Sequence, residues 1–394
     1  MKLAILTEAN LSPKHGVGMQ LLRTFVGGPM EYFSLFLHSW HDGKSEPPHA
    51  HLLEDRWLDE RWPSGLRGKH FANRLMFQAD QCWWHDGQIN RKRMEQLVAD
   101  YDLRCGVAYV NIAKEESALK VCSILRFLGC PYIVHLMDLY HERLDPAAMP
   151  GMCELMRGAS TVIALTDTLK DEAAKFFPRE LITLGIGVEP SSKLAKPPGD
   201  GPFRVIFTGR VYREGLEMLE GSLPLVRRAL PNIEFVYAGP HSVTIPPKLK
   251  ERTQDFGFVK DADQFQQILS DCHCAFLCGP HVLDNLGKYS FPSRVADYMM
   301  AGLPVVGTVN PGSATWRMLK PLDGAGIVLV NSPEEIVAGF AELASSSTRW
   351  RQASESTREY ACGHFSMDRI RHDIFDLLER AARHTTTVSA GIDQ

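Results

Sequence analysis

The stretch YSFPSRVADYMMAGLPVV, residues 289–306, decides the fold of this chain. Pro292 stops any preceding helix and often stands at a helix start, so a new helix is expected there with Ser293 as its cap. Gly302 is placed to end that helix, and the apolar residues 303–306 begin a buried strand. A loop, a helix and a buried strand in this order indicate an α/β sheet.

Polar residues gather at the start of this helix. Ser293 and Arg294 at a helix N-terminus favour an anion, such as a phosphate. Asp297 follows one turn later and is placed to bind a sugar hydroxyl. The preceding loop, residues 285–290, is rich in backbone amides suited to cradling phosphate. The structural alternative is an ordinary cap followed by a surface carboxylate.

Strands and helices alternate through both halves of the chain. In the first half, strands are expected at residues 2–7, 105–111, 131–137 and 159–165, and helices at about 19–25, 115–128 and 167–176. In the second half, strands are expected at 204–208, 233–238, 274–278 and 326–330, and helices at about 215–229 and 263–270, with two more at the end. The alternation predicts two parallel sheets with helices on both faces and a cleft between the domains.

The stretch 289–306 resembles the donor-binding segment of the retaining family-four glycosyltransferases. Many members carry Pro-Ser-Lys-Leu-x-Glu-Tyr-Met-Ala-Ala-Gly-Lys-Pro-Val-Val there. Arg294 stands where Lys is usual and Asp297 where Glu is usual, and both keep the charge. The earlier glutamate of the family falls on Tyr289, so the paired-carboxylate motif is incomplete.

The resemblance covers most of the frame. Residues 158–172 look like the segment that closes the family's first domain, and residues 203–210 like the first strand of its donor domain. Residues 40–95 match no pattern of the family. The implied fold is GT-B: two Rossmann-like doubly wound domains facing each other across a cleft. The expected organisation has four parts. An acceptor-binding domain (residues 1–190) is followed by a Pro- and Gly-rich linker (191–202) and a nucleotide-sugar-binding domain (203–365). A terminal helix packing back on the first domain, with a tail, ends the chain (366–394).

The resemblance implies a donor site in the second half of the chain. The family holds the donor diphosphate with an arginine, here Arg210, and a nearby lysine whose position is taken by Glu214, so Arg213 is the expected substitute. Surface ion pairs are the structural alternative for both arginines. The complete expected donor set is Arg210, Arg213, Tyr289, Ser290, Ser293, Arg294 and Asp297.

Two groups in the first half are expected near the transferred sugar and the acceptor. Gly16, Val17 and Gly18 follow the first strand; in the resembling family this glycine loop approaches the sugar, whereas a plain turn is the alternative. His135 and Asp138 end a strand and are the expected catalytic residues, because family members carry a His-Asp or an Asp-Leu-Trp-Pro element near it. A buried His packed in the core is the alternative.

Composition narrows the possible functions. The chain has 394 residues, is 44% hydrophobic and 23% charged, and carries a formal net charge of −4, which suits a two-domain globular protein and gives no reason to expect nucleic acid. Its nine cysteines have no framework spacing, no secretory signal is recognised, and no apolar run is long enough to span a bilayer, so we expect free thiols and a cytoplasmic location. Cys272, Cys274 and Cys278 lie in or beside one apolar strand, which favours buried thiols over zinc ligands.

The sequence therefore predicts a glycosyltransferase that moves a sugar from a nucleoside-diphosphate-sugar donor to an acceptor hydroxyl. The resemblance implies retention of the anomeric configuration, no metal and no cofactor besides the donor substrate. The acceptor class stays open: a sugar, a lipid-linked molecule, a protein or a small molecule. Two alternatives remain, namely a non-hydrolysing sugar-nucleotide epimerase on the same fold and a catalytically silent binding or scaffold protein.

Overall fold

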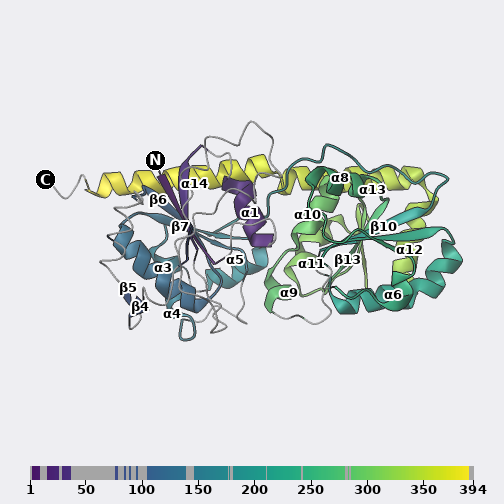
Figure 1. Cartoon of the computed structure of the whole chain (residues 1–394), viewed down its shortest axis with the longest axis horizontal. Coiled ribbons are helices and arrows are strands. Elements are labelled where there is room, and N and C mark those ends of the chain that lie inside the picture. Colours follow the sequence, from purple (N-terminus) through teal and green to yellow (C-terminus); the bar gives the residue numbers. More distant parts are fainter. Residues whose placement is uncertain are drawn as a thin grey trace. The chain divides into compact units, whose positions relative to one another are not determined.

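The structure, a computed structural model, describes residues 2–8, 16–25, 29–36, 76–78, 84–85, 88–89, 95, 104–138, 146–175, 177, 181–209, 211–240, 243–279, 283 and 285–389. The chain forms two compact units (Figure 1). The first comprises Met1–Gly187 and Asp368–Gln394, and the second comprises Val188–Met367. The second unit is thus one uninterrupted stretch of chain, and it contains residues 191–202, the expected linker.

A parallel sheet forms the centre of the first unit. Within the described residues it has seven strands in the order β3-β2-β1-β6-β7-β8-β9. These strands are β1 (Lys2–Thr7), β2 (Glu31–Phe36), β3 (Met76–Gln78), β6 (Val107–Asn111), β7 (Tyr132–Leu136), β8 (Thr161–Ala164) and β9 (Leu181–Thr183). A separate antiparallel pair joins β4 (Trp84–His85) and β5 (Gln88–Ile89). The continuous apolar runs of β1, β6 and β7 are typical of strands buried on both faces.

Helices cover both faces of this sheet. They are α1 (Gly16–Phe25), α3 (Glu115–Leu128), α4 (Pro150–Gly158), α5 (Asp167–Ala174) and α14 (Met367–Ser389). In Figure 1, α1 and α14 lie on one face, and α3, α4 and α5 on the other. Phe25 of α1 meets the ring of Tyr109 edge-on at 4.8 Å and the ring of Phe375 at 5.9 Å. The last helix therefore completes the core of the unit in which the chain began.

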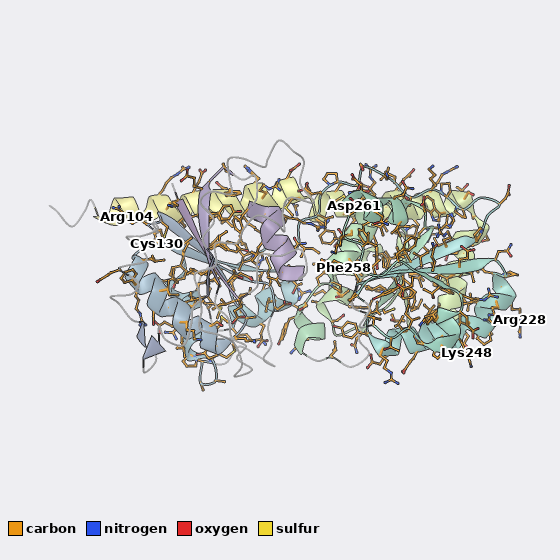
Figure 2. All side chains as sticks on the ribbon, viewed as in Figure 1. Arg104, Cys130, Arg228, Lys248, Phe258 and Asp261 are labelled. Atoms are coloured by element: carbon orange, nitrogen blue, oxygen red, sulfur yellow. The ribbon has the colours of Figure 1, made fainter. Side chains whose placement is uncertain are left out.

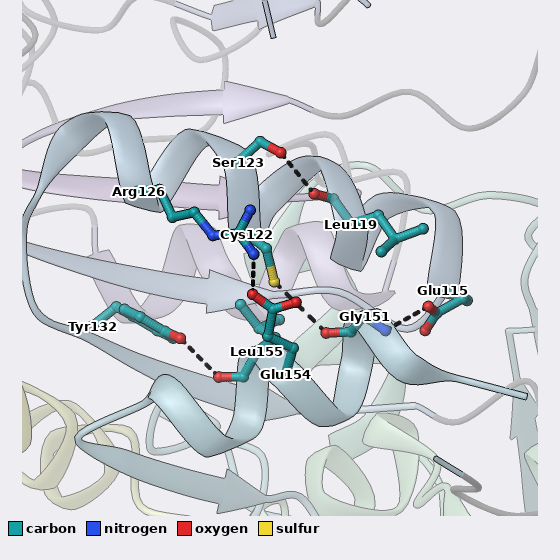
Figure 3. Close-up of polar contacts among 9 residues, drawn as sticks. All are labelled: Glu115, Leu119, Cys122, Ser123, Arg126, Tyr132, Gly151, Glu154 and Leu155. Atoms are coloured by element: carbon teal, nitrogen blue, oxygen red, sulfur yellow. Dashed lines mark hydrogen bonds and ion pairs between the residues drawn. The ribbon is translucent and has the colours of Figure 1, made fainter. Parts of the chain in front are cut away.

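Polar contacts join α3 to α4 (Figure 3). The N-cap residue of α4 makes no capping bond through its own side chain. Instead, the Glu115 carboxylate of α3 accepts from the amides of Gly151 at 2.6 Å and Met152 at 3.0 Å. Arg126 forms an ion pair with Glu154 further along the two helices. An acidic group at a helix N-terminus satisfies its open amides and opposes the helix dipole, so Glu115 fixes the position of α4.

The second unit is built on the same plan. Within the described residues its sheet has six parallel strands in the order β12-β11-β10-β13-β14-β15. The strands are β10 (Phe203–Thr208), β11 (Ile233–Ala238), β12 (Thr253–Asp255), β13 (Cys274–Cys278), β14 (Val305–Thr308) and β15 (Ile327–Val330). Each sheet reverses its strand order beside its first strand, which defines a doubly wound sheet. The expected α/β fold with two doubly wound sheets is confirmed.

The helices of the second unit are α6 (Arg213–Ala229), α7 (Pro247–Lys250), α8 (Ala262–Ser270), α9 (Asn285–Tyr289), α10 (Ser293–Met300), α11 (Ala314–Leu319), α12 (Pro333–Ser345) and α13 (Ser347–His364). Side chains of α6 and α12, including Leu219 and Phe340, pack with Val205 and Phe276 of the sheet in one core. In Figure 1, α8, α10 and α13 lie on the opposite face. Among all described helices, none combines the length and apolar composition that a bilayer crossing requires.

Several boundaries differ from those expected. Three helices, not two, follow β15, because Ser346 ends one and caps the next through a bond from the Arg349 amide. The strand expected from residue 303 begins at Val305. The strands β2, β9 and β12 were not expected. Glu31 and Ser34 interrupt the apolar pattern of β2, and β9 and β12 are only three residues long.

Candidate functional site

The carboxyl ends of β10 and β13 form the switch point of the second sheet. β10 pairs with β11 on one side and β13 on the other. The connections from these two central strands leave in opposite directions, which opens a crevice at their carboxyl ends. Ligands of doubly wound sheets bind in this position. The residues that follow β10 and β13 are therefore the first candidates for a binding site.

Gly209 shapes the turn after β10. Its φ of 68° is in the left-handed region, which glycine adopts without the strain that a Cβ would cause. The Gly209 amide donates to the Ala238 carbonyl at 2.9 Å, and the Gly209 carbonyl accepts from the Tyr237 hydroxyl at 3.1 Å. These bonds fix the direction in which the chain leaves β10.

Arg294 of α10 reaches this turn. Its Nη1 donates to the Thr208 carbonyl at 3.0 Å, and the same atom would lie 3.3 Å from a Cβ built on Gly209. The side chain is partly buried. A guanidinium held on the last carbonyl of a central strand places a permanent positive charge at the switch point.

Neighbouring ionisable groups respond to this charge. Burial raises the pKa of Cys278 to about 12, while the positive charge of Arg294 opposes the rise. Burial also raises the pKa of Tyr237 and of Tyr298, again opposed by Arg294. Because these side chains come from β13, β11 and α10, Arg294 acts on three elements that meet at the carboxyl end of the sheet.

The first turn of α6 packs directly on β13 and β14. A Cβ on Gly215 would lie 2.8 Å from the Cys278 Cβ and 3.1 Å from the Thr308 Oγ1. The close approach brings the positive end of the α6 dipole to the switch point. Arg213, the first residue of α6, is 86% exposed and pairs with Glu217 at 2.6 Å. The surface ion pair considered as its structural alternative is thus present.

The segment before α10 differs from the expected loop. Residues 285–289 form the short helix α9. Pro292 is the N-cap residue of α10 and Ser293 its first helical residue, so the expectation that Ser293 caps this helix is wrong. A residue already inside the helix has its hydroxyl displaced from the N-cap position, from which the bond to the first-turn amides is made. Ser293 still lies at the N-terminus of α10.

The remaining donor candidates fall on α9 and α10 or close to them. Tyr289 is 1% exposed, and the Lys288 Nζ lies 4.8 Å from its ring centroid. The Ser290 carbonyl accepts from the Thr315 hydroxyl at 3.3 Å. Asp297 is partly exposed and lies three residues after Arg294 on α10. Arg210 lies outside the described residues.

The catalytic candidates in the first unit lie on β7 and just beyond it, and β7 pairs with β6, one of the two switch-point strands of that sheet. His135 of β7 is 1% exposed; its Nδ1 lies 2.6 Å from the Tyr109 hydroxyl, and its carbonyl accepts from the Asn111 amide group at 2.8 Å. Burial lowers the pKa of His135 to about 3, so the ring is neutral near pH 7. Asp138, two residues beyond β7, is partly exposed.

The predicted glycine loop is helical. Gly16, Val17 and Gly18 form the first turn of α1, so the helix starts about three residues earlier than expected. Val17 packs against the core of the first unit. Glycine lowers the helix propensity of this turn, which is why the sequence favoured a loop. Packing of Leu21 and Phe25 against the sheet outweighs that preference.

Some residues at the switch points were not expected from the sequence. Tyr298 was not among the expected site residues, yet its hydroxyl bonds the end of β10. Glu8 follows β1 directly, and its Oε2 accepts from the Ala113 amide at 3.1 Å. Burial raises the pKa of Glu8 above its ordinary value. An acidic residue immediately after the first strand was the available signal.

The three cysteines around β13 are buried thiols. The Cys272 Sγ donates to the Ile268 carbonyl and the Cys274 Sγ to the Ala275 carbonyl. Burial raises the pKa of each of the three thiols. In the part of the chain that the structure describes, no three His, Cys, Asp or Glu side chains group as metal ligands do.

The family comparison agrees with this geometry. Residues 202–346, which contain β10, α6, α10 and the switch point, match the family model described as Glycosyl transferases group 1. The match includes residues 289–306, so the resemblance found there is confirmed, and the matched stretch makes up most of the second unit.

Solved structures match both units of the chain. HepE from Anabaena, solved in complex with UDP, is 13% identical with a TM-score of 0.68, covering 96% of this chain and 100% of that one. Sucrose-phosphate synthase from Thermosynechococcus elongatus is 11% identical with a TM-score of 0.65, covering 96% and 98%. Trehalose 6-phosphate synthase from Burkholderia multivorans is 12% identical with a TM-score of 0.60, covering 98% of each chain. At these identities the likeness establishes the fold. A search of curated protein sequences gave no match.

Proposed function

We propose that the protein transfers a sugar from a nucleoside-diphosphate-sugar donor to an acceptor hydroxyl, and that the second unit binds the donor. The observation that carries this proposal is the Arg294 guanidinium at the switch point, 3.0 Å from the last carbonyl of β10. The match of residues 202–346, which include Arg294, to glycosyl transferases group 1 supports the reaction class.

The diphosphate is assigned to the crevice beside Arg294. The planar guanidinium carries five N–H donors in a fork that suits phosphate oxygens. The N-termini of α6 and α10 lie at the same edge, and neither N-cap residue, Tyr212 or Pro292, bonds the first-turn amides through its side chain. Helix N-termini favour anions through their amides and dipoles. Together these groups match the charge of a nucleoside diphosphate.

The ribose is assigned to Asp297. It lies one turn beyond Arg294 on α10, so both side chains belong to the same rigid helix. A carboxylate accepts hydrogen bonds from two adjacent hydroxyls. HepE was solved with UDP and with UDP-glucose, which makes uridine diphosphate sugars the first donors to test.

We further propose that the reaction retains the anomeric configuration and needs no metal. Arg294 and Arg210 would stabilise the charge that develops on the departing diphosphate, the role that a divalent ion has elsewhere. The bond from the anomeric carbon to the phosphate oxygen breaks as the bond to the acceptor oxygen forms on the same face. The acceptor proton passes to the departing phosphate oxygen, so no second carboxylate is required.

A catalytically silent binding protein is the second candidate. The family's earlier glutamate is replaced by Tyr289, whose ring is buried, and Arg213 is engaged with Glu217 at the surface. This candidate predicts nucleotide binding without sugar transfer.

Titration calorimetry with UDP, GDP and ADP tests the donor assignment. We expect one diphosphate to bind the wild type. Arg294→Gln should weaken that binding at least tenfold, about 1.4 kcal/mol, whereas Arg294→Lys should keep most of it because the charge remains. Arg228→Gln is the matched control, since Arg228 is exposed in the last turn of α6 (Figure 2). Equal binding by wild type and Arg294→Gln would overturn the assignment.

Transfer itself is measured as nucleoside diphosphate released from the donor sugar with a panel of acceptors. Release that depends on an acceptor supports the transferase. Binding with no turnover on any acceptor favours the silent protein. Conversion of the donor sugar without an acceptor would instead indicate the epimerase.

A further inference from the structure

Two cysteine thiols meet at the amino-terminal edge of the first sheet. The Cys105 Sγ lies 3.3 Å from the Cys130 Sγ. Cys105 stands two residues before β6, and Cys130 stands two residues before β7, just after Gly129 ends α3. Both residues are partly exposed, whereas Cys122, Cys153, Cys272, Cys274 and Cys278 are buried.

The backbone holds the two thiols in place. The Gly106 amide donates to the Lys2 carbonyl at 2.9 Å, and the Ala108 amide donates to the Pro131 carbonyl at 2.8 Å. These bonds join the residues next to each cysteine to the same parallel sheet. The pair lies at the amino ends of β6 and β7, while the candidate acceptor residues lie at or beyond their carboxyl ends. In Figure 2, Cys130 and Arg104, the neighbour of Cys105, are labelled at the periphery of the first unit.

The two thiols are chemically unequal. Cys105 donates its S–H to the Cys130 sulfur. This bond lowers the pKa of Cys130, while it raises the pKa of Cys105, which burial raises further. The thiolate is the nucleophile in thiol–disulfide exchange. Cys130 is therefore the residue that attacks first, and Cys105 is placed to resolve the product.

We propose that Cys105 and Cys130 form a redox site that exchanges with small disulfides of the glutathione class. The Cys130 thiolate attacks one sulfur of the small disulfide, forms a mixed disulfide and releases one thiol. Cys105 then loses its proton and attacks the Cys130 sulfur, which forms the protein disulfide and releases the second thiol. Two protein thiols are oxidised and one small disulfide is reduced to two thiols, so no further oxidant is needed.

The geometry suits the second step. A disulfide bond is about 2.05 Å long, so from 3.3 Å the sulfurs approach by only about 1.25 Å. A short rotation of two partly exposed side chains supplies such a movement without displacing the strands. The bond would close the segment from Cys105 to Cys130, which contains β6 and α3, and so restrict the conformations of the unfolded chain. The inference is independent of the proposed transfer activity.

The test uses the full chain with oxidised glutathione, followed by alkylation of the remaining thiols and peptide mapping. We expect one intramolecular bond between Cys105 and Cys130, the loss of two of the nine alkylation sites and recovery of both with dithiothreitol. The oxidised protein should melt several degrees higher. A bond from either residue to another cysteine, such as Cys362, or no bond at all would overturn the proposal.

Single variants test the order of attack. Cys105→Ser should stop at a stable glutathione adduct on Cys130, and Cys130→Ser should leave Cys105 largely unmodified. Cys122→Ser is the control, because the Cys122 thiol is buried and donates to the Gly151 carbonyl at 3.6 Å (Figure 3); it should form the bond as the wild type does. Equal modification of Cys105 and Cys130 in the two single variants would refute the assigned roles, while mapping of the wild type tests the site without any substitution.

Discussion

The Tyr298 hydroxyl bonds the backbone amide and the side-chain hydroxyl of Thr208, the last residue of β10. It lies 2.8 Å from the Thr208 amide nitrogen and 2.7 Å from the Thr208 Oγ1. Both residues are fully buried. A helix side chain thus satisfies the amide at which the central strand ends, one turn of α10 beyond Arg294. The contact ties the helix that carries the donor candidates to the strand beside which the donor is proposed to bind.

Tyr298→Phe should therefore destabilise the second unit and weaken nucleotide binding. A buried amide left without its partner costs about 1–3 kcal/mol in the free energy of unfolding. Denaturant unfolding and calorimetry measure the two effects. Tyr360→Phe is the control, because it also removes a hydroxyl bond, to the Met318 carbonyl, but away from β10. It should lower stability alone. An unchanged unfolding free energy for Tyr298→Phe would contradict the role given to this contact.

Gly215 and Gly221 of α6 form a matched pair of sites for substitution. Gly215→Ala would bring its Cβ to 2.8 Å from the Cys278 Cβ and 2.9 Å from the Cys278 Cα, so the start of α6 must move away from β13. We expect a loss of about 1–3 kcal/mol of stability and weaker nucleotide binding. Gly221→Ala, with no atom within 4 Å, should gain up to about 1 kcal/mol through helix propensity. Similar changes in stability and nucleotide binding for the two substitutions would show that α6 does not pack tightly at the switch point.

Arg210 and Asp297 should differ in the kinetic parameter they affect. Arg210 is predicted to meet the diphosphate, whose charge grows as the glycosidic bond breaks. Arg210→Ala should cost about 2–4 kcal/mol of transition-state stabilisation, which is measured as a fall in kcat/KM. Asp297→Asn should mainly raise KM for the donor, because the ribose is held equally before and during the reaction. Steady-state kinetics separate the two cases. Normal turnover by a folded Arg210→Ala protein would remove Arg210 from the donor site.

A chelator should leave sugar transfer largely intact. The reason is that arginine side chains are proposed to neutralise the departing diphosphate. Initial rates with and without EDTA measure the effect. Complete loss of activity that manganese or magnesium restores would refute the metal-free mechanism.

His135 predicts how stability depends on pH. Its pKa is about 3 in the folded protein, below the ordinary value of 6.5, so only the unfolded chain binds a proton between these values. Its contribution to stability is complete above pH 6.5 and is lost as the pH falls towards 3. The slope is up to about 1.4 kcal/mol per pH unit.

His135→Gln should flatten this acid-side slope while it retains a polar partner for Tyr109. Denaturant unfolding at about pH 7 and about pH 5 measures the difference between variant and wild type. Parallel curves would mean that the ring titrates equally in both states. In that case His135 would be available as an acid or base near neutral pH.

The sequence was most informative where burial is continuous. The runs of β10, β11 and β13 are mostly apolar and end at glycine or at turn residues, so their positions were predicted to within a residue. α3 was predicted with the correct ends because Gly129 takes the left-handed conformation that ends it. These signals are local, and no distant contact is needed to interpret them.

The errors came where a distant contact outweighs local preference. Gly16 and Gly18 favour a loop by themselves, yet packing of Phe25 against Tyr109 supports a helix through them. The bond between Tyr298 and Thr208 joins residues ninety positions apart, and no spacing within the helix indicates it. The donor candidates on α10 were indicated by their place at an expected helix N-terminus and by the resemblance, because residue type and charge are given by the sequence whereas the geometry of their contacts is not.

The return of the chain to its first unit fixes an order of events during synthesis. Residues 188–367 emerge from the ribosome as one stretch, whereas the core of the first unit also needs Ile370, Phe375 and Leu378 of α14. Domains fold as units once their sequence is available. The second unit is thus completed first. Until α14 has been synthesised, the strands around Tyr109 keep an uncovered apolar face. A chain truncated before α14 should therefore bind chaperones through the uncovered apolar face of its first sheet.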